Sequence, residues 1–347
     1  YVEGGWPNPS NAVDREFFKA VARRRFRSRI AVFGSTRRPG TTCGRDAFLR
    51  MLVRSEAPVA TIFGKSWDLH VKHVIRVSRS ENLDMIGDSI AYMKRHMDEV
   101  LFDAEHFFDG YRENSGYALK TLRVAREAGA DVLVLCDTNG GTLPGECLEI
   151  YRDVKARTDA PLGVHFHNDS GCADANTFLA VAEGAVQIQG TVNGLGERCG
   201  NANLCTLIPG LQLKQGHNLV SSRQLAMLTE ASLFISEVAN VSHNIRAPYV
   251  GEGAFSHKAG AHADGVRKKR KSFEHVDAAA VGNYRRFVVS DQAGRSTILE
   301  KLSKVKADLP KNDPTVNKLL SEIKRLESAG YHFEAADGSF ELLAREM

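Results

Sequence analysis

Residues 117–136 read YALKTLRVAREAGADVLVLC, which joins a helix pattern to a strand pattern through a short break. Apolar side chains recur at helical spacing up to Ala128, and Gly129 stands where a helix stop is expected. The same unit repeats along the chain, and seven strand-like runs follow one another: Val2–Glu3, Ile30–Phe33, Val59–Phe63, Val100–Asp103, Val132–Cys136, Leu162–His167 and Val186–Gly190. Their centres lie roughly 24 to 41 residues apart, the length of a strand plus a crossover helix, so the pattern predicts a parallel α/β fold.

Seven such strands are one fewer than an eight-stranded βα barrel contains. We therefore predict a (β/α)8 TIM barrel that lacks its first strand, which would precede Tyr1. An open doubly wound sheet is the alternative. The chain begins without an initiator Met, and we expect the sequence to be incomplete at this end.

The pattern becomes mostly helical after the last predicted strand. One long helix is expected over Ser222–Ala239, opened by a Ser cap, and a charged helical stretch over Ser296–Glu327. A strand-like run, Tyr331–Phe333, follows a second break. We predict three parts: a truncated barrel over residues 1–213, helical subdomains over 214–327, and the start of a truncated C-terminal regulatory domain over 328–347.

Composition excludes several classes of protein. The 347 residues are 43% hydrophobic and 25% charged, values that exclude collagen, a coiled coil and wholesale disorder. No apolar run approaches the roughly 18 residues of a membrane helix. A net charge of +4 does not make nucleic acid a default partner. The six cysteines form no C-x-x-C pair, and reduced thiols in the cytoplasm are expected.

The sharpest chemical signal is Val164-His165-Phe166-His167-Asn168-Asp169 at the end of a predicted strand. Side chains of a strand alternate between its two faces, so His165 and His167 point the same way. Two imidazoles at the carboxyl end of a barrel strand form half of a site for a divalent metal. Hydrogen-bonded histidines at the rim are the alternative interpretation.

A glycine- and amide-rich loop, NGLGERCGNAN at residues 193–203, follows the last predicted strand. Its glycine spacing differs from that of the dinucleotide fingerprint, so a Rossmann site is not expected. The loop can bring Asn201 close to a metal or an anion, and a tight βα turn that needs glycine is the alternative.

Two further clusters carry ionisable side chains. Asp103 and Glu105 share a face where a strand ends, and a carboxylate there could act as a general base or cap the next helix. His257-Lys258-Ala259-Gly260-Ala261-His262 lies outside the barrel and could carry a histidine to its mouth for proton transfer. The basic run at residues 267–271 is either a solvated face or a site for the phosphates of a nucleotide-bearing substrate.

Five ordered motifs together resemble the isopropylmalate and homocitrate synthase family, and they span essentially the whole chain. They are FDAEHFFDGY at 102–111, CDTNGG at 136–141, HFHND at 165–169, GERCGN at 196–201 and HKAGAH at 257–262. The Asn-Gly-Gly after Thr138 and the stretch SFEHVD at 272–277 look most like the citramalate synthase branch.

The resemblance implies a Claisen-type condensation of acetyl-CoA with a 2-keto acid, with a divalent ion (Mg, Mn or Zn) polarising the keto group. It also implies roles for individual side chains: metal ligands His165, His167 and Asn201, substrate-binding residues Asp103 and Thr138, and proton-handling residues Glu105 and His262. We expect (R)-citramalate from pyruvate, as in isoleucine biosynthesis, by a homodimer. The alternatives are 2-isopropylmalate from 2-ketoisovalerate, an acyl-CoA lyase or aldolase, and a non-catalytic binding protein.

Two departures from the family pattern affect these expectations. The Arg-Asp pair that the family carries on its first barrel strand has no equivalent after Tyr1. We therefore expect this polypeptide alone to bind metal poorly and turn over little. Phe273 stands where several relatives have a tyrosine beside the catalytic histidine, which argues against a phenol in the reaction.

Overall fold

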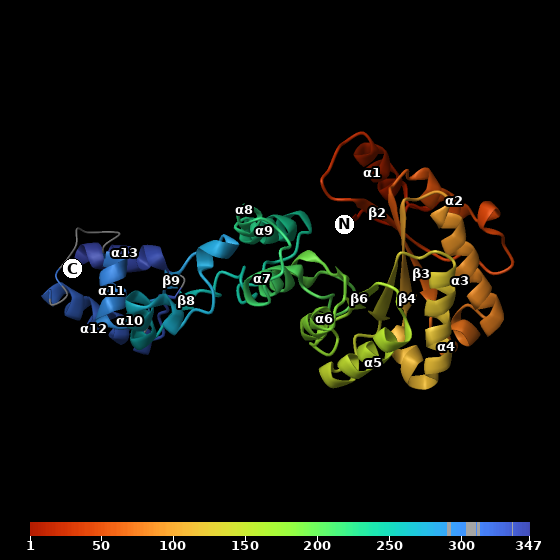
Figure 1. Cartoon of the computed structure of the whole chain (residues 1–347). Helices are drawn as coiled ribbons and strands as arrows, with labels where there is room; N and C mark the ends of the chain where they lie inside the picture. Colours follow the sequence, from red (N-terminus) through yellow and green to blue (C-terminus); the bar gives the residue numbers. More distant parts are fainter. Residues whose placement is uncertain (290–292, 303–309, 311–312, 335) are drawn as a thin grey trace. The chain divides into compact units, whose positions relative to one another are not determined.

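The computed structural model describes residues 1–289, 293–302, 310, 313–334 and 336–347. Its chain forms two compact units, Tyr1–Leu207 and Ile208–Met347 (Figure 1). The predicted boundary after residue 213 falls inside helix α7 (Leu204–Lys214), and the predicted three-part division stays a prediction. No described helix combines the length and apolarity that crossing a membrane requires.

Unit 1 contains a sheet of seven strands in sequential order, and every neighbouring pair is parallel. The strands are β1 (Val2–Glu3), β2 (Ile30–Ser35), β3 (Val59–Lys65), β4 (Glu99–Glu105), β5 (Val132–Asp137), β6 (Leu162–Phe166) and β7 (Gln187–Gln189). All seven predicted strands are thus present, in the order of a βα barrel. The sheet is curled into a half-barrel, and the predicted fold class is confirmed.

Side-chain alternation separates the two faces of this sheet. One face packs small and aliphatic residues inside the curl: Ala31, Val59, Leu101, Val132, Val134 and Cys136. The alternate residues pack against the surrounding helices, as Phe102 and Phe166 do, both fully buried. Burial on both faces is the reason that these strands read as continuous apolar runs.

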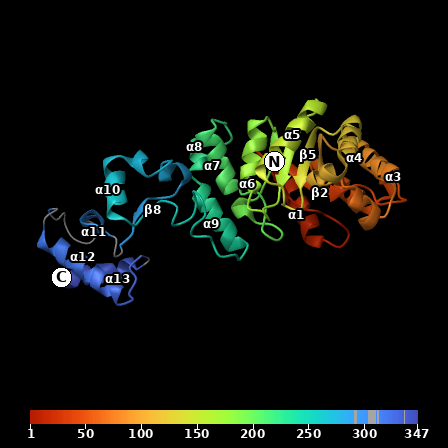
Figure 2. The ribbon, with the colours of Figure 1, turned by 90° about the horizontal axis from the view of Figure 1, so that it is seen from below.

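The helices of unit 1 lie on the outer side of the sheet, and strands β2 and β5 lie within the arc that they form (Figures 1 and 2). They are α1 (Ala12–Ala22), α2 (Ala47–Arg54), α3 (Arg79–Lys94), α4 (Phe107–Glu127), α5 (Pro144–Arg157) and α6 (Ala173–Ala182). Helix α4 begins earlier than the predicted Tyr117 because two helical segments meet at Asn114, whose backbone is not helical. The Asn114 side chain accepts a hydrogen bond from the Tyr117 N–H, which caps the second segment.

Unit 2 is mostly helical, as predicted, and its described residues include a two-stranded sheet. Its elements after α7 are α8 (Ser222–Leu225), α9 (Leu228–Val238), β8 (Ser256–His257), α10 (Gly260–Lys268), β9 (Arg286–Phe287), α11 (Arg295–Leu302), α12 (Pro314–Ser328) and α13 (Asp337–Glu346). Helices α11 to α13 share a core that includes Ile298, Leu319 and Phe340. The predicted helical stretch to Glu327 is therefore present in part, and residues 303–309 and 311–312 lie outside the described residues.

Two local predictions in unit 2 are wrong. The single helix expected over Ser222–Ala239 is divided between α8 and α9. Gly282, at φ +72°, approaches the carbonyl group of Ala226 so closely that a Cβ would overlap it, and this contact lies at the break. The expected strand Tyr331–Phe333 is irregular; Phe333 instead packs into the core of the last three helices.

Candidate active site

One cavity opens at the carboxyl ends of the strands of unit 1 and has a volume of about 360 Å³. Parallel strands bring their carboxyl ends to one edge, so side chains distant in sequence meet there. Six of the predicted site residues line this cavity: Asp103, Glu105, Thr138, His165, His167 and Asn201. The seventh, His262, belongs to unit 2.

The two predicted histidines lie on the inner side of β6. Phe166 between them is buried toward the helices, and the ring centroids of His165 and His167 are 5.1 Å apart with planes at 52°. Burial lowers the pKa of His165 to about 4, and the neighbouring His167 adds to the effect. Burial likewise lowers the pKa of His167. Both rings are therefore neutral near pH 7, which is the form that binds a metal ion.

Asn201 reaches His165 from the glycine-rich loop. Its Nδ2 lies 3.1 Å from Nε2 of His165, and its backbone forms an isolated bridge with His167. Gly196 leaves room for this side chain, because a Cβ there would overlap Oδ1 of Asn201. Gly200, at φ +85°, lies against the carbonyl group of Gly194. The same glycines thus form a tight turn and make room for Asn201. The two interpretations of this loop, a tight βα turn and a loop that brings Asn201 to a ligand, are therefore compatible.

Asp103 is buried beside a glutamine that the sequence analysis did not single out. Gln189 Nε2 donates a hydrogen bond of 2.8 Å to Asp103 Oδ1, and Gln189 Oε1 lies 2.9 Å from Nδ1 of His165. Burial raises the pKa of Asp103 well above its usual range, and the carboxylate of Glu3 adds to the shift. The one signal for Gln189 in the sequence is its place at the end of the strand predicted over Val186–Gly190.

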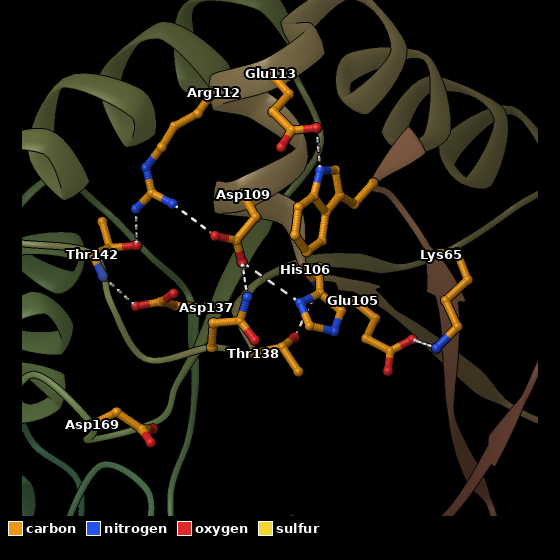
Figure 3. Close-up of polar contacts among 12 residues, drawn as sticks. Lys65, Glu105, His106, Asp109, Arg112, Glu113, Asp137, Thr138, Thr142 and Asp169 are labelled. Carbon is orange, nitrogen blue, oxygen red and sulfur yellow. Dashed lines mark hydrogen bonds and ion pairs between the residues drawn. The ribbon is translucent and has the colours of Figure 1, made fainter. Parts of the chain in front are cut away.

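Glu105 and Thr138 stand at the ends of neighbouring strands (Figure 3). Glu105 forms an ion pair with Lys65, which is its register partner on β3. Thr138 follows β5, and its Oγ1 accepts a hydrogen bond of 2.8 Å from the backbone N–H of His106. A carboxylate and a hydroxyl group are therefore held at the same rim of the cavity.

A cluster of rings that the sequence analysis also missed lies behind Glu105. His106 is buried in a left-handed conformation, with φ 57°, and its ring centroid is 4.0 Å from that of His70. Trp67 stacks on His70 at 5.3 Å. His70 lies in a π-helical turn over His70–Val74, and burial together with His106 lowers its pKa. This π turn follows no hydrophobic period that a sequence pattern would show.

Charged side chains brace the loops around the cavity. Arg198 binds Asp169, with Nε 2.8 Å from Oδ1, and donates to the backbone carbonyl of Thr138 at 2.7 Å. Arg112, on the helix that follows β4, donates to Oγ1 of Thr142 in the loop after β5 at 2.8 Å (Figure 3). These pairs hold the loops that follow β4, β5 and β6 in one arrangement.

His262 is described within unit 2 alone. It is exposed on α10 and stacks on Phe273, with ring centroids 4.3 Å apart. The next residue, Glu274, is buried, lies 3.0 Å from Nε2 of His257 and binds the guanidinium group of Arg285 through both oxygens. This buried network anchors the segment that carries Phe273 against His262.

The donor groups of the cavity fit part of a shell for the divalent ion that the motifs imply. His165 Nε2 faces Asn201, and His167 Nδ1 is buried without a hydrogen-bond partner among the described residues. No cluster of three or more His, Cys, Asp or Glu suited to a metal ion occurs in the described part of the chain. Two imidazoles and an amide oxygen suit zinc or manganese when substrate or water oxygens complete the shell.

Comparison with protein-family models gives two matches. The model described as HMGL-like matches residues 1–234, which carry the sheet and the cavity. The model described as homocitrate synthase post-HMGL domain-like matches residues 249–330 in unit 2, the region of His262.

Individual proteins extend these matches. The (R)-citramalate synthase of Geobacter sulfurreducens is 49% identical over 346 residues, which are 99% of this chain and 65% of that protein. The (R)-citramalate synthase of Aquifex aeolicus is 50% identical, over 99% of this chain and 66% of its own length. The chain thus spans just under two thirds of these curated relatives. A solved HMG-CoA lyase from Bacillus subtilis shares the fold, with a TM-score of 0.57 at 20% identity over 69% of this chain and 80% of that one.

Proposed function

The chain belongs to the HMGL-like family, whose model covers residues 1–234, and from this premise we propose that the protein condenses acetyl-CoA with pyruvate to give (R)-citramalate and CoA. The observation that carries the proposal is the convergence of six motif residues on one cavity at the mouth of the half-barrel. The names of the relatives at 49% and 50% identity support this choice of substrate. The protein is then an acyltransferase.

The 2-keto acid would occupy the cavity between its histidines and its aromatic wall. His165, His167 and Asn201 would hold a divalent ion, which when bound polarises the keto group as a Lewis acid. The Thr138 hydroxyl would donate to the carboxylate of the keto acid. Asp103, whose pKa burial raises, could present a carboxyl proton to the same substrate.

Aromatic residues that line the cavity support the choice of a small substrate. Trp6, Phe33 and Phe63 line the cavity, with the rings of Phe33 and Phe63 stacked at 5.2 Å and Trp6 edge-on to Phe63 at 5.5 Å. The methyl group of pyruvate would pack against this wall. 2-Ketoisovalerate adds two methyl groups, and a hydrophobic pocket usually discriminates one methylene-sized group by about 1–3 kcal/mol.

Glu105 and His262 carry the proton-handling roles that the resemblance implies. One of them would take a proton from the acetyl methyl group of acetyl-CoA. The resulting enolate carbon would bond to the keto carbon as the C=O π bond opens onto oxygen, and that oxygen would take up a proton to become the hydroxyl group of citramalyl-CoA. Water then attacks the thioester carbon, and the C–S bond breaks to release CoA as a thiol. This hydrolysis makes the condensation irreversible, which a lyase of the same fold would not need.

The test is release of free thiol by the full-length protein with acetyl-CoA and either keto acid. We expect kcat/KM for pyruvate to exceed that for 2-ketoisovalerate at least tenfold, with citramalate as the product by mass spectrometry. A preference for 2-ketoisovalerate would make the protein a 2-isopropylmalate synthase instead. Cleavage of citramalyl-CoA without hydrolysis would indicate a lyase. The identity of the metal and the homodimer stay predictions from the resemblance, and a cytoplasmic location stays a prediction from the cysteine pattern.

A further inference from the structure

Gln189 connects residues of the cavity that come from separate strands. It lies at the carboxyl end of β7, in register with His165 on β6. Its Nε2 donates a hydrogen bond of 2.8 Å to Oδ1 of Asp103 on β4, and its Oε1 lies 2.9 Å from Nδ1 of His165. On the other side of the ring, Nε2 of His165 lies 3.1 Å from Nδ2 of Asn201. Four side chains thus form one continuous chain of hydrogen bonds.

The chemistry of the groups fixes the direction of this chain. An amide donates only from its nitrogen and accepts only at its oxygen. In the structure the nitrogen of Gln189 faces Oδ1 of Asp103 and its oxygen faces His165, so Asp103 accepts at Oδ1 and a carboxyl proton, when present, lies on Oδ2. Nδ1 of His165 is then the protonated nitrogen, because two facing acceptors would repel each other. Nε2 consequently carries the lone pair; it accepts a hydrogen bond from Nδ2 of Asn201 in this structure, and it becomes available to a cation when the Asn201 amide turns its oxygen toward the ion.

We infer that Gln189 is a positioning residue that sets the tautomer and ring orientation of His165, so that Nε2 is the atom presented to a cation in the cavity. The role of that cation rests on the proposed function. Histidines that bind metals usually donate their second N–H to an acceptor that fixes the ring, and such acceptors contribute strongly to affinity. Here the acceptor is an amide oxygen, which is itself oriented by Asp103.

Gln187 provides a matched control on the same strand. It lies two residues earlier, on the same face of β7, and is in register with Gly163 instead of a histidine. Its Oε1 is buried and makes no hydrogen bond among the described residues. Gln187→Leu therefore removes the same chemical group as Gln189→Leu without changing the partners of His165.

The first experiment determines the tautomer in the metal-free full-length protein by ¹⁵N–¹H NMR of the histidine rings, with His165 assigned by substitution. We expect a proton on Nδ1 and a lone pair on Nε2 in the wild type and in Gln187→Leu. Gln189→Leu should lose this fixed tautomer. A wild-type His165 that is protonated at Nε2 overturns the inference, and this result needs no variant to fold.

The second experiment measures binding of Mn²⁺ alone by calorimetry. Loss of such an acceptor typically weakens metal binding about 10- to 100-fold, which we expect for Gln189→Leu. Gln187→Leu should match the wild type, and Gln189→Glu should lose less than Gln189→Leu because it keeps an acceptor toward His165. An unchanged Kd in Gln189→Leu overturns the inference.

Neither experiment uses a substrate, so the two proposals fail separately. If the tautomer and the Kd values are as expected but the protein does not condense acetyl-CoA with pyruvate, the proposed function is overturned and the role of Gln189 stands. A wild-type protein that binds no Mn²⁺ would remove the electrophile from the proposed function. The NMR result would then still decide whether Gln189 orients His165.

Discussion

Gly196→Ala tests whether the glycine-rich loop positions the side chain of Asn201 for its role in the cavity. An added Cβ would overlap Oδ1 of Asn201 and lie 3.0 Å from its Cγ, so the amide group must move by on the order of 1 Å. Misplacement of this size at a reacting centre can cost about 100-fold in rate. The backbone of Gly196 does not need a positive φ, so we expect the free energy of unfolding to change by only about 1 kcal/mol.

The assay is thiol release by the full-length protein with acetyl-CoA and pyruvate, beside a thermal melt of each variant. Gly141→Ala is the matched control, because it lies on the neighbouring loop with nothing within 4 Å of its added Cβ and no positive φ. We expect kcat/KM to fall about 100-fold in Gly196→Ala and to remain at the wild-type value in Gly141→Ala. Parental activity in a folded Gly196→Ala protein would refute the role given to Asn201, and an equal loss in Gly141→Ala would show that any bulk on the rim is harmful.

Three further predictions concern His165, Thr138 and Glu274. Burial lowers the pKa of His165 to about 4, so between pH 6.5 and 4 the unfolded chain binds a proton at this residue that the folded chain does not. The free energy of unfolding of the metal-free protein should therefore fall by at most about 3 kcal/mol as the pH is lowered through this range. Urea titrations of His165→Gln should show a weaker fall. Thr138→Val removes the acceptor of the His106 N–H and should lower kcat/KM for pyruvate roughly tenfold or more. Thr138→Ser keeps the hydroxyl group and should restore kcat/KM, and wild-type kinetics in Thr138→Val would contradict this prediction. Glu274→Gln leaves Arg285 and His257 without their buried carboxylate and should lower the free energy of unfolding of this region by about 3 kcal/mol. Backbone amides of residues 254–287 should then exchange hydrogen faster, and unchanged exchange would show that the network is dispensable.

The architecture of unit 1 was predictable because each strand carries its signal locally. Strands buried on both faces are short continuous apolar runs, and a glycine such as Gly129 ends the helix before the next run. The errors occur where a distant contact decides the local structure. The break between α8 and α9 lies where Gly282 meets Ala226, a contact that no helical period reveals. Tyr331–Phe333 has strand-forming residues, but Phe333 is used by a helical core.

The site was predictable to the extent that its residues belong to motifs at strand ends. The placement of His165 and His167 follows from strand alternation and from the rule that parallel strands meet at their carboxyl ends, whereas Thr138 was singled out by the family resemblance. Gln189 and Lys65 could not be found in this way, because their importance lies in a partner on another strand. Gln189 matters through its register with His165 and its reach to Asp103, and both depend on the curvature of the sheet.

The two units separate the proposed chemistry into parts with independent supports. The cavity is built on the sheet of unit 1, whose core contains Phe102 and Phe166, whereas His262 is held in unit 2 by Phe273 and the network around Glu274. Damage to one support should therefore leave the other function measurable. Glu274→Gln is expected to slow condensation while Mn²⁺ binding at the cavity persists, and Gly196→Ala is expected to weaken Mn²⁺ binding while hydrogen exchange in unit 2 stays unchanged. If Glu274→Gln abolished metal binding as well, proton handling and cation binding would have to share one structural support, and the separate roles assigned to His262 and His165 would fail.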